Sequence, residues 1–222
     1  HKVRVAKKVN QNLKICLAVD NNLKMSLRQR FGKHYFRFFV NPIADFYFAA
    51  GKSTHNLLTY FGVSPNKIFL GYYGYQSDIF YQRETLKRFG FVFVGQKIKR
   101  KGIDILVSAY DIYKDQLNGK QPLYLIGGES SGDLSSLKKY GKSETGFLQP
   151  EDCSKIFALA RTLILPSYEE HWGTVVCEAA ACGCSLLLSN KVGSAPDLLM
   201  EGVNGFQFSS GSSNELASLM IG

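Results

Sequence analysis

Several features that would assign this sequence to a protein class are missing. No apolar run approaches the ~18 residues of a membrane-spanning helix, and no secretory signal is visible. The chain starts at His1 instead of a methionine, which leaves room for a lost N-terminal part. The five cysteines are odd in number, and Cys182-Gly-Cys184 is too closely spaced for the usual zinc pair. We therefore expect a cytosolic protein with reduced, buried thiols.

Acidic residues are nearly absent from the first forty positions. This segment holds ten of the 27 Lys and Arg residues but only one of the 18 acids, Asp20. The rest of the chain is balanced, so the net charge of +9 lies in residues 1–40. Five aromatic side chains follow among these bases: Phe31, Tyr35, Phe36, Phe38 and Phe39.

The basic segment has three interpretations. Helical spacing over residues 24–40 would put the aromatics on one face and the bases on the other. Such a helix packs on its own sheet, lies on an anionic membrane surface, or binds nucleic acid. The one-sided clustering of the aromatics makes nucleic acid the least favoured partner, because stacking platforms are usually interleaved on strands.

Short apolar runs alternate with helical runs along the chain, which is typical of an α/β protein with a doubly wound parallel sheet. We predict strands at residues 13–19, 44–50, 69–73, 91–94, 123–126, 162–165 and 186–189. We predict helices at residues 24–40, 54–61, 103–116, 133–140, 150–160, 174–182 and 214–220. The composition, with 45% hydrophobic and 20% charged residues, is that of a globular protein.

The most informative stretch is residues 166–183, PSYEEHWGTVVCEAAACG. A buried strand ends at Pro166, a polar loop follows, and Gly173 opens a helix. The backbone N–H groups of Gly173, Thr174 and Val175 would point out of the helix N-terminus, where the helix dipole favours an anion. The stretch therefore predicts a phosphate site.

Two carboxylates, Glu170 and Glu178, flank this turn with seven residues between them. A carboxylate accepts two sugar hydroxyls, so the pair beside an anion site suits a sugar joined to a diphosphate. The alternative is a solvated loop glutamate and an ordinary glutamate on an amphipathic helix. After the turn at Gly95, four bases in residues 96–101 add a candidate phosphate clamp, whose alternative is a solvated loop.

The stretch resembles the donor-site motif of the retaining glycosyltransferases of group 1 (family 4), which have the GT-B fold. The matching positions are Glu170, Trp172-Gly173, Glu178-Ala179 and Cys182-Gly183, and the similarity continues through SLLLSNKVGSAPDLLMEGVNGFQF. The resemblance covers most of the chain from Ile43 onward. It implies a partial acceptor-side domain at residues 1–76 and a complete nucleotide-sugar donor domain at residues 77–222. The start of the acceptor domain and the C-terminal helix are not found.

The resemblance also implies residue roles. Glu170 would be the catalytic contact to the donor sugar, and Glu178 would hold the nucleotide ribose. Other binding residues would be Gly95, Gln96, Lys97, Lys101, Trp172, Gly173, Thr174 and Val175. Lys101-Gly102 matches the Lys-Gly of the family, whereas Gln96 stands where the family has a phosphate-binding Arg, so Lys97 or Arg100 would have to replace it.

We therefore expect a retaining hexosyltransferase of polysaccharide biosynthesis. Its donor would be a nucleoside diphosphate sugar and its acceptor a glycan or a lipid-linked sugar. No metal or other cofactor is expected, because lysines and a helix N-terminus neutralise the diphosphate and the sequence has no Asp-x-Asp pair. The expected location is the cytoplasm, peripherally on the inner face of the membrane. The alternatives are a basic membrane-surface or nucleic-acid binding module with a relic nucleotide pocket, and a hexosyl epimerase.

Overall fold

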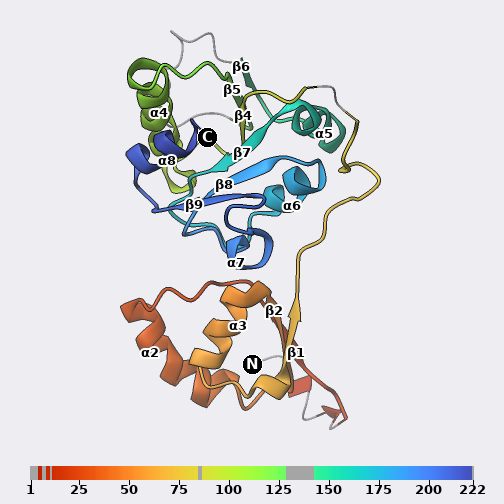
Figure 1. The fold of residues 1–222 in the computed structure, drawn as a ribbon. Helices are drawn as coiled ribbons and strands as arrows, with labels where there is room; N and C mark the ends of the chain where they lie inside the picture. Colours follow the sequence, from red (N-terminus) through yellow and green to blue (C-terminus); the bar gives the residue numbers. More distant parts are fainter. Residues whose placement is uncertain (1–4, 7–8, 11, 85–86, 129–142, 222) are drawn as a thin grey trace. The chain divides into compact units, whose positions relative to one another are not determined.

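The computed structural model describes residues 5–6, 9–10, 12–84, 87–128 and 143–221, which form two compact units (Figure 1). One unit runs from His1 to Tyr73 and the other from Gly74 to Gly222. Both units are α/β with parallel sheets, so the predicted fold class is confirmed. The helix predicted at residues 133–140 lies outside the described part of the chain. No helix in the described part is long and apolar enough to cross a bilayer.

The first unit is a three-stranded parallel sheet in the order β1-β2-β3. Its elements are β1 (Cys16–Val19), α2 (Leu27–Tyr35), the π-helical turn η1 (Phe36–Val40), β2 (Phe46–Ala50), α3 (Gly51–Tyr60), the 3-10 turn η2 (Pro65–Lys67) and β3 (Ile68–Gly71). The core gathers around Tyr47, Ala49 and Leu58, which are completely buried. The strand predicted at residues 13–19 is shorter than expected and begins at Cys16.

The helix predicted over residues 24–40 forms as α2 and η1. It begins later than expected because Ser26 caps it, its hydroxyl accepting a hydrogen bond from the Gln29 N–H at 3.3 Å. Phe36 packs on the core of the unit, with its ring centroid 4.9 Å from that of Phe61. The other four aromatics are exposed: Phe31, Tyr35, Phe38 and Phe39. Packing on the sheet therefore explains one of the five aromatics.

The second unit contains a six-stranded sheet in the order β6-β5-β4-β7-β8-β9, and every pairing is parallel. The strands are β4 (Phe91–Val94), β5 (Leu123–Ile126), β6 (Ser143–Thr145), β7 (Thr162–Leu165), β8 (Ser185–Ser189) and β9 (Gly205–Phe208). After β4, the next two strands, β5 and β6, are added on one side of it. The chain then returns to the other side of β4 and adds β7, β8 and β9 in the opposite direction. The strand order therefore reverses between β4 and β7, where open α/β sheets bind ligands at the carboxyl ends of the strands.

Helices cover both faces of this sheet, as a doubly wound fold requires (Figure 1). They are the 3-10 turn η3 (Lys99–Lys101), α4 (Ile103–Asp111), the π-helical turn η4 (Ile112–Gln116), α5 (Pro150–Leu159), α6 (Thr174–Ala181), α7 (Ala195–Leu198) and α8 (Ser213–Leu219). Helix α4 packs beside α8, and α5 packs beside α6. The central strands are buried on both sides, so β7 is apolar throughout after Thr162 and has no exposed residue.

Gly102, in the loop after β4, packs directly against the backbone of the loop after β7. Its φ is +72°, and a Cβ atom there would lie 2.0 Å from the carbonyl oxygen of Pro166. Only glycine adopts this left-handed conformation while allowing such a close backbone approach. The Lys-Gly pair recognised in the sequence is therefore a packing requirement as well as a candidate site.

We predict that Gly102→Ala lowers the free energy of unfolding by about 2–4 kcal/mol, because the new methyl group would force the two loops apart. Denaturant unfolding followed by circular dichroism measures the effect. Gly146→Ala is the matched control, since a Cβ there meets no atom within 4 Å and no left-handed φ is involved. Equal destabilisation by the two substitutions would contradict the prediction.

Candidate functional site

The candidate site begins where β4 and β5 end. Gly95 follows β4 with a φ of +151°, and Gly127 follows β5 with a φ of +135°. A Cβ atom on Gly127 would lie 2.0 Å from the carbonyl oxygen of Gly95, so the two backbones touch at this point. Because both residues are glycines, neither fills the space beside the strand ends with a side chain, and a ligand can approach the backbone of Gly95 and Gly127.

A cavity of about 440 Å³ lies against these strand ends. Its volume is in the range of small-molecule sites, roughly 300–1,000 Å³. Gly95, Gln96, Phe147, Leu148, Cys153 and Glu178 are among the residues that line it. Three of the predicted binding residues, Gly95, Gln96 and Glu178, therefore share one cavity.

Glu178 is the charged residue among those that line the cavity in the described part of the chain. It lies in the second turn of α6, as the sequence predicted. Loss of hydration through burial raises the pKa of its carboxyl group. A carboxylate that has lost hydration water favours hydroxyl donors, so this wall of the cavity suits a polyhydroxylated ligand.

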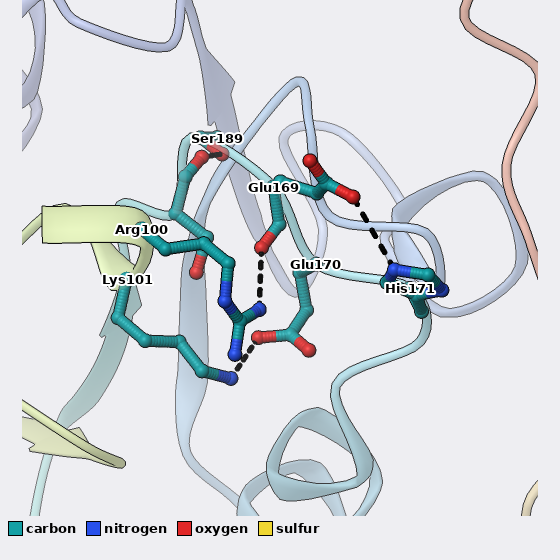
Figure 2. Close-up of polar contacts among 7 residues, drawn as sticks. Arg100, Lys101, Glu169, Glu170, His171 and Ser189 are labelled. Atoms are coloured by element: carbon teal, nitrogen blue, oxygen red, sulfur yellow. Dashed lines mark hydrogen bonds and ion pairs between the residues drawn. The ribbon is translucent and has the colours of Figure 1, made fainter. Parts of the chain in front are cut away.

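Lys101 and Glu170 meet beside the cavity, at the ends of the loops after β4 and β7. The Nζ of Lys101 donates to Oε2 of Glu170, and the two side chains are only 16% and 10% exposed (Figure 2). The loops are held together by the backbone N–H of Tyr168, which donates to the carbonyl of Arg100 at 2.9 Å. The structure thus brings together the predicted phosphate lysine and the predicted catalytic carboxylate.

Three further polar side chains lie on the same two loops: Arg100, Glu169 and His171. Nη1 of Arg100 donates to the backbone carbonyl of Glu169 at 3.1 Å, and the carboxylate of Glu169 lies 3.3 Å from Nε2 of His171. Figure 2 shows Arg100 and Lys101 extending side by side toward the Glu169–Glu170 stretch. Two bases and two carboxylates therefore meet at this edge of the site, with Lys101 paired to Glu170 and Arg100 bonded to a neutral carbonyl.

A segment that the sequence analysis did not single out fixes the Glu170 loop from the other side. The N–H of Glu170 donates to the carbonyl of Lys191 at 3.1 Å, and the N–H of Gly193 donates back to the carbonyl of Glu170 at 3.0 Å. The N–H of Ser194 also donates to the carbonyl of Trp172 at 3.1 Å. The VGSAP turn after β8 was the signal in the sequence, since glycine and proline mark turns at strand ends.

Two predicted binding residues have buried side chains. Lys97 and Trp172 are each 3% exposed, and neither lines the cavity. Burial of the Trp172 side chain anchors the loop, and its backbone carbonyl accepts the N–H of Ser194. Arg100, in contrast, is exposed, which makes it the more accessible of the two bases considered as replacements for the family Arg at Gln96.

Gly173, Thr174 and Val175 form the start of α6, as predicted. Gly173 is the N-cap with a φ of +85°, and Thr174 is the first helical residue. The N–H groups of a first helical turn have no partner inside the helix, and the dipole there favours an anion. These residues lie on the segment between Glu170 and Glu178, although they do not line the cavity itself.

Comparisons with known proteins agree with this geometry. The family model for glycosyl transferases group 1 matches residues 76–221. O-antigen chain mannosyltransferase B of Escherichia coli is 31% identical over 115 residues, which cover 49% of this chain and 30% of that protein. An uncharacterized glycosyltransferase of Methanocaldococcus jannaschii is 27% identical over 160 residues, covering 70% and 43%. The chain spans less than half the length of these relatives.

Solved structures are similar in fold. HepE of Anabaena in complex with UDP has a TM-score of 0.77 and 18% identity, covering 98% of this chain and 64% of that one. Sucrose-phosphate synthase of Thermosynechococcus elongatus has a TM-score of 0.71, also at 18% identity, covering 99% and 61%. With a cavity at the carboxyl ends of β4 and β5 of a doubly wound sheet and a family match over residues 76–221, the chain belongs to the group 1 glycosyltransferases of the GT-B fold.

Proposed function

We propose that the protein transfers a hexose from a nucleoside diphosphate sugar to a glycan or lipid-linked acceptor, with retention of configuration. The cavity at the end of β4 carries this proposal, because it has Glu178 on its wall and the Lys101–Glu170 pair on the adjoining loops. A uridine nucleotide is the first donor to test, since HepE was crystallised with UDP and with UDP-glucose.

Each predicted residue has a role in this proposal. Glu178 accepts hydrogen bonds from the ribose hydroxyls, and Glu170 contacts the sugar and stabilises positive charge on its anomeric carbon. Lys101 and the first amides of α6 neutralise the diphosphate as it leaves. The proposal includes no divalent metal, because protein cations and backbone N–H groups take over the neutralisation.

The runner-up function is a binding module in which the nucleotide site is a relic. It requires the basic first unit to carry the activity and requires Glu170 and Glu178 to be dispensable. The position of the partly buried Glu178 on the cavity wall favours the enzyme, because carboxylates with a perturbed pKa in a cavity are more common at functional sites.

We predict that UDP binds in the presence of EDTA and that Glu178→Gln weakens this binding by about 1–3 kcal/mol, the range for a hydrogen bond to a charged group. Titration calorimetry on the whole chain measures both effects. Glu151→Gln, an exposed carboxylate in the first turn of α5, is the matched control and should leave the affinity unchanged. Binding that disappears in EDTA would overturn the metal-free mechanism.

The proposal also places the enzyme peripherally on the cytoplasmic face of a membrane. Four exposed aromatics on α2 and η1 support this, and Phe31 and Phe38 are 76% and 65% exposed. Arg28, Arg30 and Arg37 are exposed on the same two elements. Aromatic side chains beside bases are typical of surfaces that lie in an anionic headgroup layer, and each base near such a surface contributes roughly 1 kcal/mol.

We predict that the protein co-sediments with anionic vesicles at low salt and that Phe31→Ser with Phe38→Ser reduces the bound fraction several-fold. Binding should weaken as salt shortens the Debye length below ~8 Å, because the bases provide the long-range attraction. Phe206→Ser, which removes a 43% exposed aromatic from β9, is the control. Equal binding to neutral vesicles, or tighter binding to duplex DNA, would contradict the membrane assignment.

A further inference from the structure

The Lys101–Glu170 ion pair joins two residues that the proposed function assigns to different parts of the donor. Lys101 is assigned to the diphosphate and Glu170 to the sugar. In the structure they are instead each other's partner, with side chains only 16% and 10% exposed. A donor that occupies the site as proposed therefore has to replace one of these partners.

Two bases at this edge of the site, Arg100 and Lys101, can meet an anion. Gln96 lines the cavity at the position where the family has Arg, and its amide is neutral. Lys97 is buried. Arg100 is close, but its hydrogen bond goes to the neutral carbonyl of Glu169. A guanidinium has five donor N–H groups, so Arg100 retains donors and its charge for an added anion. The charge of Lys101, in contrast, is neutralised by the carboxylate of Glu170.

We propose that Lys101 exchanges partners when the donor binds: the diphosphate takes the place of Glu170, and Glu170 is thereby released toward the sugar. This inference rests on the proposed function and adds a coupling between its two halves. If Glu170 stayed beside Lys101, its negative charge would face the phosphate oxygens at short range with little screening. Exchange removes that repulsion and readies the carboxylate only when a donor is present.

The exchange needs only side-chain movement. The backbone of Glu170 is fixed by hydrogen bonds to Lys191 and Gly193, and the backbone of Arg100 is fixed by the N–H of Tyr168. Rotation about the side-chain bonds of Lys101 and Glu170 separates the charged groups without breaking these contacts. The ion pair therefore holds the proposed catalytic carboxylate against Lys101 until a diphosphate takes its place.

The test is the affinity for UDP of Glu170→Gln, measured by calorimetry on the whole chain. We expect binding to tighten about three- to tenfold, the effect of removing a competing ion-pair partner from a half-buried lysine. UDP-glucose should gain less than UDP, because the variant loses a contact to the sugar. Glu169→Gln is the matched control: it removes the neighbouring carboxylate, which pairs with His171, and should change the affinity less than twofold.

A double-mutant cycle shows whether the gain passes through Lys101. Lys101→Met should weaken UDP binding at least tenfold, and adding Glu170→Gln to it should give no further gain. Unchanged or weaker UDP binding by Glu170→Gln, or an equal gain in the Lys101→Met background, would overturn the exchange while leaving the proposed function in place. If wild-type protein bound neither UDP nor GDP nor ADP, the proposed function would fail and this inference with it.

Discussion

The backbone contact between the loops after β4 and β7 is the constraint on which the rest of the site depends. Gly102 lies against the carbonyl of Pro166, and the carbonyl of Arg100 accepts the N–H of Tyr168. Lys101 and Glu170, 69 positions apart in the chain, are side by side because of this contact. The reversal of strand order at β4 and β7 makes the contact available, since only there do two loops leave neighbouring strands in opposite directions.

The Glu170 loop is held from a second side by the turn after β8, through Lys191, Gly193 and Ser194. Burial of the Trp172 indole adds a third anchor. Because the backbone of this loop and the Trp172 side chain are fixed, only the other side chains of the loop can change conformation. A backbone fixed in advance holds its N–H and C=O dipoles in place before a ligand binds. Such dipoles stabilise charge that develops during a reaction without having to reorient, while the charged side chains remain able to move.

The sequence was sufficient for the fold class, the strands β4, β5, β7 and β8, and the helix that carries Glu178. These follow from short apolar runs and turn residues, which are local signals. The turn after β8 has a local signal in its glycine and proline, but its contact with the Glu170 loop could not be predicted, and neither could the Lys101–Glu170 pair, because both depend on contacts between distant segments. The placement of Lys97 illustrates the same limit. A run of basic residues predicts side chains that are solvated or bind a ligand. In the structure the Lys97 side chain is buried, whereas Arg100 is exposed.

Charge is divided along the chain between two physical roles. At the site, carboxylates and bases are paired at short range, so the proposed recognition of a donor depends on geometry and on the exchange of Lys101 between partners. On α2 and η1, the exposed bases Arg28, Arg30 and Arg37 have no acidic residue on their own elements. Their attraction for an anionic surface acts over a distance and is screened within ~8 Å at physiological salt. The exposed aromatics beside them add apolar burial, which salt does not weaken. The proposed attachment to a surface and the proposed recognition of a donor should therefore respond differently to salt, and either one can change while the other is preserved.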